Sequence, residues 1–442
     1  MRSAEGRRGR LLALCLAAML GLVAVVVVEG SATASEARGH FLSQQALLVS
    51  DLHSAQAEGY GPDDLQPVTA AKLELEGALE PPWIGDRSEF YHQQAQREAQ
   101  LRDQLTSLRL HLLDQSQKAA SARLQDASNQ VAEDIKLGTD EADLKPVQLQ
   151  LDLANQQFQA AHTLADYRTS AKQSEIVAGS AADVGAAQKA ELASIQLAAE
   201  QLKGKPIDSL IAGGRDSLAT GRDEAAAATW LKVSGFDRPY NLLEKYALLL
   251  SPNDAGQAAV AAAALKRYGD QIHQSLLKGM PPKAILISMA GQYLAAYEAG
   301  KLVQETYVTT GRPPDLATDI GPMKVLWKQA PWKMHSPWPK ESPYWYPDTL
   351  VQRVVWFTNT GEGLHDASWQ PDGTYGPGSQ YGPSASHGCI HVPPVSEAFL
   401  FGWVDYGTPV VIYPGDGQPL RAQLAQKTTD DDGNPFTGPK GA

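Results

Sequence analysis

Between Gln44 and Lys278, apolar residues recur every three to four positions, which is the spacing of an amphipathic helix. Two stripes are clear: Leu101, Leu105, Leu108 and Leu112, then Val147, Leu151, Ala154, Phe158 and Ala161. Between them, Leu137-Gly138-Thr139 predicts a helix end and a new cap, and Pro146 suits a first helical turn. The pattern predicts a helical hairpin or bundle.

Short alanine-rich helices are expected after Gly213-Gly214, and Gln257 to Leu277 predicts the last helix before the pattern changes. Residues 35–280 are therefore interpreted as an all-α bundle or coiled-coil region. Such a region serves as a spacer or a self-association element, and a ligand-binding sensor is the alternative.

The pattern changes at Met280-Pro281-Pro282 to short runs rich in β-branched residues, which predict strands. The expected strands are 284–289, 292–297, 301–309, 323–328, 351–358 and 408–413, with a short helix at 394–405. The predicted fold class is α+β, with the all-α region followed by a mainly β domain at 283–414. The polar, Gly- and Pro-rich tail at 415–442 is predicted to be disordered.

The segment from Trp332 to Tyr346 concentrates tryptophan, tyrosine and proline within the β domain. It suits a lid or wall over a cleft. It equally suits an irregular hairpin that its aromatic residues stabilise, so both readings stay open.

The 442 residues suggest two or three domains, the first preceded by a targeting segment at 1–34. Four arginines lie among the first ten residues, an apolar run extends from Leu11 to Val28, and Ala32-Thr33-Ala34 offers a cleavage site. This segment predicts a signal peptide or an N-terminal membrane anchor. The rest of the chain is expected outside the cytoplasm, facing the cell wall and either secreted or anchored to the membrane.

Formal net charge is −12 and no basic tract occurs, so nucleic acid is not an expected partner. No cofactor is predicted.

Candidate chemistry gathers in the stretch Ser386-His387-Gly388-Cys389-Ile390-His391. Cys389 is one of two cysteines; the other, Cys15, lies in the apolar N-terminal run. A thiolate is the nucleophilic form of cysteine, and a nearby histidine such as His365 or His387 can take its proton. Cys389 is therefore a candidate nucleophile. Two alternatives are a small buried hydrophobic residue and a zinc site formed with His365, His387 and His391.

With these motifs, residues 283–414 resemble the L,D-transpeptidase catalytic domain, the YkuD family. The resemblance includes Thr318-Asp319-Ile320-Gly321, His365-Asp366-Ala367-Ser368-Trp369, Ser386-His387-Gly388-Cys389 and Gly407-Thr408-Pro409-Val410. Two departures stand out: His391 occupies a position where the family usually carries Arg or Asn, and the 20-residue gap between His365 and Ser386 is longer than usual and rich in glycine.

The resemblance implies that Cys389 attacks a peptidoglycan stem peptide and that His365 accepts the thiol proton. The backbone carbonyl of Asp366 is expected to orient His365, and amides near Gly388 and Cys389 to stabilise the oxyanion. His387 either tunes the thiolate or is a structural histidine.

Expected substrate-binding residues are Asp366, Ser386, His391, Trp369 and Trp356, and packing stays open for His391 and both tryptophans. The implied activity joins donor and acceptor stems by 3-3 cross-links in cell wall biogenesis, with D-alanine released and no metal. The alternatives are carboxypeptidase trimming of stems and a non-catalytic wall-associated scaffold.

Overall fold

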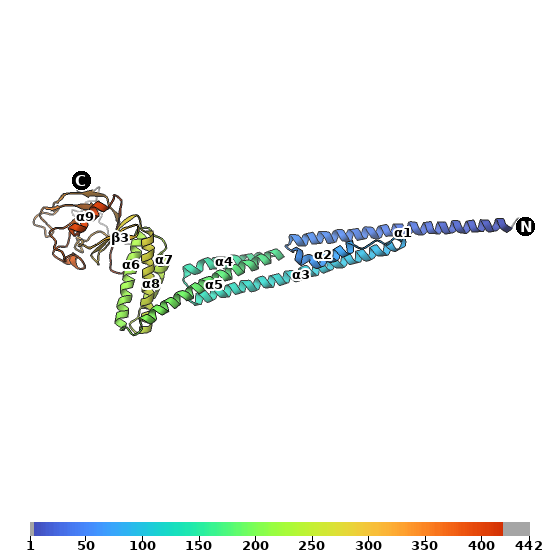
Figure 1. Cartoon of the computed structure of the whole chain (residues 1–442), viewed down its shortest axis with the longest axis horizontal. Coiled ribbons are helices and arrows are strands. Elements are labelled where there is room, and N and C mark those ends of the chain that lie inside the picture. Colours follow the sequence, from blue (N-terminus) through green and yellow to red (C-terminus); the bar gives the residue numbers. More distant parts are fainter. Residues whose placement is uncertain (1–3, 419–442) are drawn as a thin grey trace. The chain divides into compact units, whose positions relative to one another are not determined.

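A computed structural model describes residues 4–418, without the side chains of residues 4–17, 26 and 27. Residues 1–3, the side chains of the other N-terminal arginines and of Cys15, and residues 419–442 of the expected tail lie outside this described part. Helices occupy residues 4–279 and a sheet-containing domain follows, so the predicted α+β class is confirmed (Figure 1).

The helices are α1 Ala4–Ala57, α2 Pro62–Glu76, α3 Ile84–Lys136, α4 Glu141–Ala160, α5 Leu164–Gln201, α6 Ile207–Trp230, α7 Asp237–Ala247, α8 Ala255–Gly279, the short 3-10 helix η1 Ser379–Tyr381 and α9 Pro394–Trp403. The strands are β1 Lys283–Ser288, β2 Tyr293–Glu298, β3 Lys301–Tyr307, β4 Gly321–Lys324, β5 Trp327–Gln329, β6 Trp332–Met334, β7 Thr349–Val351, β8 Val354–Trp356, β9 Gly363–Asp366, β10 Ile390–Val392 and β11 Pro409–Tyr413.

The chain divides into two compact units, Met1–Lys189 and Ala190–Ala442, and α5 crosses the division. Helices α6, α7 and α8 therefore share a unit with the strands. The domain boundary expected between 280 and 283 rested on composition and stays a prediction.

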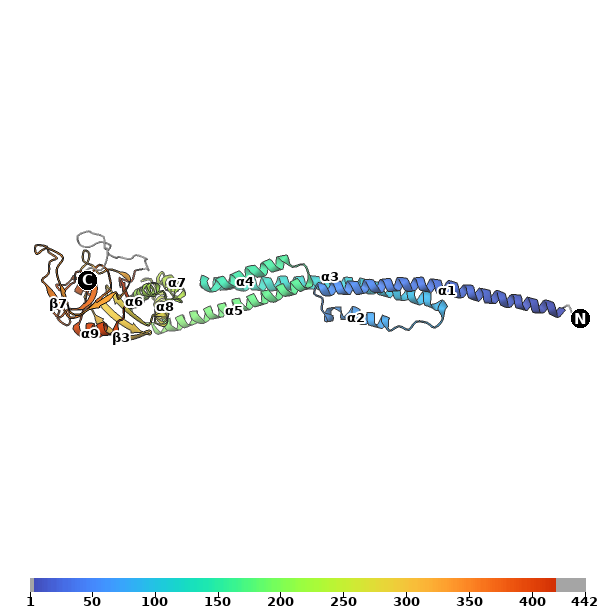
Figure 2. The same ribbon diagram turned by 90° about the horizontal axis from the view of Figure 1, so that it is seen from above.

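In the first unit, α1 and α2 pack along α3 (Figure 2). Leu101 and Leu105 of the first predicted stripe are buried there with leucines of α1 and α2. Val147 and Ala154 of the second stripe are buried against α3 and α5. Both stripes thus form helix cores, as their spacing predicts.

Two expected helix ends differ from the structure. The cap before α4 is Asp140, whose Oδ1 accepts from the Ala142 amide at 2.9 Å, and Pro146 lies beyond the first turn. Gly213 and Gly214 do not end a helix but lie within α6. A Cβ at Gly214 would come within 2.8 Å of Leu250 Cδ1, so this glycine permits close packing rather than a turn.

Within the described residues, one helix is long and apolar enough to cross a membrane, the stretch Ala18–Ala57 of α1, whose most apolar window has a mean hydropathy of 1.7. A signal sequence has the same character, so this helix fits either form of the predicted N-terminal segment.

In the second unit, a five-stranded sheet has the order β3-β2-β1-β11-β4 and a four-stranded sheet has the order β10-β9-β8-β5. Strands β6 and β7 form a separate hairpin. The strand expected at 351–358 is broken into β7 and β8 because the Asp366 carboxylate accepts from the amides of Gln352 and Arg353, both at 2.8 Å. The strand expected at 323–328 is likewise divided, into β4 and β5 of different sheets.

Strands β1 and β11 are buried on both faces. Alternate residues of a strand point to opposite sides. Ile285 and Val410 face a core shared with the second sheet and α9, whereas Leu286 and Val411 face a core formed with α6, α7 and α8. The helices just before the strands therefore form part of the domain interior, which explains why β1 is an uninterrupted apolar run.

Candidate active site

The pairing of β9 with β10 brings the predicted site residues together. The strands are parallel, with His391 beside His365 and Val392 beside Asp366. His365 and His391 therefore share one face of the sheet. Cys389 directly precedes β10 and lies two residues before His391, although 24 residues separate His365 from Cys389 in sequence.

His365 is buried, with 1% of its surface exposed. Its Nδ1 lies 2.9 Å from the backbone carbonyl of Asp366, so this nitrogen carries the proton and donates to the carbonyl. Burial lowers the pKa of His365, while the Asp366 carbonyl and carboxylate oppose that shift. The imidazole is thus held neutral near pH 7, with Nε2 as the nitrogen that can accept a proton.

Cys389 is half-buried, and its Sγ lies 3.6 Å from the carbonyl oxygen of Gly361. Gly361 occupies the turn before β9, with a φ of 92° that favours glycine. The next residue, Glu362, is buried and accepts from the Asp319 amide at 3.0 Å. The sulfur therefore lies against a turn that a buried carboxylate holds in place.

The turn that presents Cys389 is tied by side-chain hydrogen bonds. The Ser386 hydroxyl accepts from the Gly388 amide at 3.1 Å and donates to the Cys389 carbonyl. The Thr318 hydroxyl donates to the Gly388 carbonyl at 2.7 Å and accepts from the Gly311 amide at 2.9 Å. Gly388 has a φ of 127°, which a side chain would strain.

These contacts change two expected roles. Ser386 is buried and serves the turn rather than a substrate. The Gly388 amide is already engaged by that serine, so Gly388 contributes conformation and not a free oxyanion donor. Asp366 is also buried, with its carboxylate engaged by backbone amides, so it supports the site from within.

His387 contacts the aromatic segment that includes the β6–β7 hairpin. Its ring centroid lies 5.3 Å from that of Trp338 and 5.1 Å from that of Tyr346. The Tyr344 hydroxyl of the same segment donates to Asp315 at 3.1 Å, on the loop after Gly311. Trp332, in contrast, packs edge-on against Trp356 at 4.8 Å. One part of the segment therefore forms a wall beside His387, and another part packs in the core of the hairpin.

His391 and Trp369 lie against the catalytic histidine candidate. The His391 ring centroid is 5.0 Å from that of His365, and Trp369 lies 5.9 Å from His365 and 5.4 Å from His391. His391 is 7% exposed and its Nδ1 faces Gln370 Oε1 at 3.1 Å, so it is engaged within the protein. Trp369 is 42% exposed, and its role in substrate binding stays a prediction.

Trp356 is not a cleft residue. It is 1% exposed and stacks on Trp327 at 5.4 Å within a small core that also contains Val351 and Val354. The packing alternative is therefore correct for Trp356.

The zinc alternative gains no support from the arrangement of donors. Across residues 4–418, no three His, Cys, Asp or Glu side chains with described positions are placed to hold a metal ion. His365 and His391 each direct Nδ1 to an oxygen of the protein.

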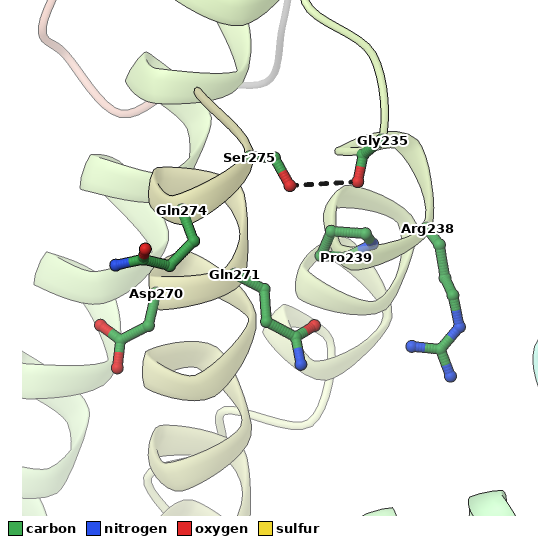
Figure 3. A pocket seen from close by; sticks show the side chains of 7 residues that line it. All are labelled: Gly235, Arg238, Pro239, Asp270, Gln271, Gln274 and Ser275. Carbon is green, nitrogen blue, oxygen red and sulfur yellow. Dashed lines mark hydrogen bonds between the residues drawn. The ribbon is translucent and has the colours of Figure 1, made fainter. Parts of the chain in front are cut away.

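A hollow of about 460 Å³ lies between α7 and α8 (Figure 3). Arg238, Asp270, Gln271 and Gln274 are among the residues that line it, and none of the predicted site residues does so. It is open to solvent, and Arg238 is paired with Glu191 at 2.8 Å.

The model of the L,D-transpeptidase catalytic domain matches residues 282–412. The chain belongs to the L,D-transpeptidase family through this domain. Among solved structures, the catalytic domain of the Enterococcus faecium L,D-transpeptidase acylated by ertapenem is 32% identical; the match covers 30% of this chain and 98% of that chain, with a TM-score of 0.26.

A mutant of the Enterococcus faecium L,D-transpeptidase is 31% identical over 30% of this chain and 50% of that chain, with a TM-score of 0.27. The L,D-transpeptidase from Mycobacterium smegmatis is 24% identical over 30% of this chain and 58% of that chain, with a TM-score of 0.27. This chain thus spans about half the length of the first solved L,D-transpeptidases it matches. A search of curated proteins finds no match.

Sequence reasoning did not assign roles to several residues of the site. Thr318 lies in a motif that it identified, but the hydrogen bond to Gly388 could not be seen. Gly361, Glu362 and Gln370 gave no signal beyond their places beside strands or motifs. Their contacts depend on pairing between segments distant in sequence.

Proposed function

We propose that this protein is an exported cysteine L,D-transpeptidase that joins peptidoglycan stem peptides. The observation that supports the proposal is the pairing of β9, which carries His365, with β10, which directly follows Cys389, together with the bond of His365 Nδ1 to the Asp366 carbonyl. This bond leaves Nε2 to accept the thiol proton. The family assignment of residues 282–412 supports the same reaction class.

In the first step, the Cys389 proton passes to His365 Nε2 and the sulfur bonds to the carbonyl carbon of the third residue of a donor tetrapeptide. The bond to the terminal D-alanine then breaks, and the leaving nitrogen takes the proton from His365. The product is a thioester on Cys389. Backbone N–H groups near Cys389 are the proposed oxyanion donors.

In the second step, the side-chain amine of the acceptor's diamino acid attacks the thioester. That amine gives a proton to His365, the carbon–sulfur bond breaks, and the sulfur is protonated again. A 3-3 cross-link results. Water in place of the amine gives trimmed stems, which is the carboxypeptidase alternative.

The wall formed by Trp338, Tyr346 and His387 suits the path of a peptide stem, because aromatic faces pack against apolar and methyl-bearing groups. Trp369, more exposed, is proposed to line the opposite part of this path.

Export, placement at the cell wall and self-association through the helical region belong to the same proposal. The apolar stretch of α1 supports a signal or an anchor. The side-by-side helices of the first unit support a spacer between that stretch and the catalytic unit.

The test compares Cys389→Ala with Cys15→Ala, which removes the other cysteine. Each protein is incubated with defined donor and acceptor stems, and also with a carbapenem, a class that acylates the family. Native protein and Cys15→Ala are expected to gain an acyl mass and to yield cross-linked stems, and Cys389→Ala to do neither. Cross-linking by Cys389→Ala would show that the nucleophile is wrong. Trimmed stems without cross-links would favour the carboxypeptidase alternative.

A further inference from the structure

His391 packs against two rings, those of His365 and Trp369. Its ring contacts His365 on one side and meets Trp369 almost at a right angle, with an interplanar angle of 87°. The Nδ1 bond to Asp366 fixes one atom of the His365 ring but leaves the ring free to tilt about that bond. A neighbouring ring packed against His365 restricts this tilt.

Gln370 holds His391 in place. Its Nε2 donates to the Thr309 hydroxyl at 2.7 Å and to the Thr374 carbonyl at 3.3 Å, so the amide orientation is fixed and Oε1 faces the His391 ring. Gln370 is 3% exposed, so water does not compete for these bonds. The Thr309 hydroxyl in turn donates to the Ser379 hydroxyl at 2.9 Å.

The backbone of His391 is tied to the same place. His391 and Thr309 exchange two backbone hydrogen bonds, of 2.8 Å and 3.0 Å. The glycine-rich segment between His365 and Ser386 is bound to the same stretch of backbone. The Gly376 amide donates to the Val308 carbonyl, and the Ser386 amide donates to the Thr310 carbonyl. The network of His391, Gln370, Thr309 and Ser379 thus joins the strand of the proposed nucleophile to the loop beside it.

Charge supports the same role. Burial, followed by the neighbouring His365 and His387, lowers the pKa of His391 well below its usual range, and a hydrogen bond with the Ser384 backbone opposes this without offsetting it. A neutral ring can pack beside His365 without repelling the imidazolium that forms when the thiol proton is taken.

We propose that His391 and Gln370 are positioning residues for His365, with His391 setting the tilt of the general base and Gln370 fixing His391. This inference rests on the proposed function, because it assigns the way in which the base of that reaction is held. Both are argued to act through His365.

The test uses the full chain with Gln370→Leu, which removes the amide, and His391→Phe, which keeps a ring but loses the bond to Gln370. The matched control is Gln304→Leu, a part-buried glutamine that donates to Ser396 at 3.1 Å between β3 and α9. Three quantities are measured: the rate at which iodoacetamide alkylates Cys389 near neutral pH, kcat and KM for a donor stem, and Tm. Alkylation is assigned to Cys389 by peptide mass, because Cys15 also carries a thiol.

We expect Gln370→Leu and His391→Phe to lower both the alkylation rate and kcat by about 10-fold to 100-fold, the scale of loss for a displaced catalytic group. KM is expected to stay near the native value and Gln304→Leu to resemble native protein. Gln370→Glu keeps an acceptor for His391 and is expected to retain more activity than Gln370→Leu, which also provides a second variant if the leucine protein does not fold.

A rise in KM with native alkylation would overturn the inference, because the network would then serve substrate contacts. A fall in Tm alone would overturn it as well, leaving only a packing role. Failure of the proposed function is separate: native protein would then transfer no acyl group, whatever the variants do to thiol reactivity.

Discussion

The helical unit that ends at Lys189 and the unit that carries Cys389 differ in how they treat buried polar side chains. In the helical unit, several buried polar atoms have no hydrogen-bond partner; they belong to Gln94, Glu98, Asp134, Thr139, Ser170, Ser174 and Gln188. Around Cys389, the buried hydroxyls and amides of Thr318, Gln370 and Thr309 are bonded to one another or to backbone.

The second unit also has unpartnered buried atoms, on Arg267, Trp356, Gln380 and Glu397, but among the residues described none of these belongs to the network of His391, Gln370, Thr309 and Ser379. An unpaired buried polar group costs about 1–3 kcal/mol of folding free energy. The helical unit tolerates this cost because its packed helices need not hold side chains in a fixed geometry. Around Cys389, the buried polar groups of Thr318, Gln370 and Thr309 have hydrogen-bond partners, which fixes their geometry.

The largest expected effect comes from cutting the chain at two places. A protein that begins at Ala190 retains α6, α7 and α8 and is expected to fold and to be acylated at Cys389. A protein that begins at Lys283 exposes Leu286 and Val411, whose burial by the helices is lost, and is expected to aggregate or unfold. Circular dichroism and the acyl mass measure both outcomes. A soluble, active protein starting at Lys283 would contradict the shared core.

The next largest effect is expected from removing one hydrogen-bonded side chain beside Cys389. Thr318→Val removes the hydroxyl that bonds Gly388 and Gly311, leaving a buried carbonyl and a buried amide unpaired. We expect a loss of about 1–3 kcal/mol in the free energy of unfolding, together with slower acylation of Cys389. Denaturant titration and acylation kinetics provide the measurements. Thr318→Ser keeps the hydroxyl and serves as the control; native stability in Thr318→Val would contradict the role of the hydroxyl.

In the helical unit, removing a buried polar group is expected to raise the free energy of unfolding rather than lower it. Glu98 is fully buried, neither carboxylate oxygen has a partner, and burial raises its pKa. Glu98→Leu is therefore expected to raise the free energy of unfolding of this unit by about 1–3 kcal/mol. Hydrogen exchange along α3 measures the gain locally. The control, Glu133→Leu, changes an exposed glutamate of the same helix and should give none.

The smallest effect is a dependence on pH at the contact between helix and sheet. Burial, then the nearby Asp416, raises the pKa of Asp223 to about 7, and the Gly417 amide opposes this. Because the unfolded carboxyl titrates near pH 4, the folded state binds more protons between about pH 4 and 7. The contribution of Asp223 to stability is thus complete below that range and lost as pH rises through about 7.

Thermal unfolding at several pH values measures this decline. Asp223→Asn is expected to flatten it, whereas Asp216→Asn, a change at an aspartate whose side chain takes no part in that contact, is expected to leave it unchanged. An identical decline in Asp223→Asn would assign the effect to other groups, with the half-buried Glu224, whose pKa burial also raises, first among them.

Much of the fold follows from local pattern. The stripes through Leu101 and Val147 became buried helix faces, and the apolar runs after Pro282 became strands, because periodicity reflects burial directly. Division of the strand at 351–358 could not be predicted, since its cause is the distant carboxylate of Asp366. Gly214 was misread for a similar reason: its neighbour Leu250 lies on another segment.

The candidate site shows the same division. Cys389 and His365 could be named because a thiol and an imidazole carry recognisable chemistry wherever they occur. Trp356 looked like a cleft residue, yet its stacking on Trp327 needs the pairing of β5 with β8. Gln370 could not be found, because an uncharged amide gains its role only from the partners that the fold supplies.

The burial of both faces of β1 and β11 limits which substitutions these strands tolerate. A substitution at Leu286 or Val411 disturbs the packing against the helices. One at Ile285 or Val410 disturbs the core shared with the second sheet, so neither strand has a face that tolerates substitution. On the outer strand β3, Leu302 and Val303 face solvent. A library of random variants selected for survival should therefore keep many residue types at 302 and 303 and very few along the two central strands.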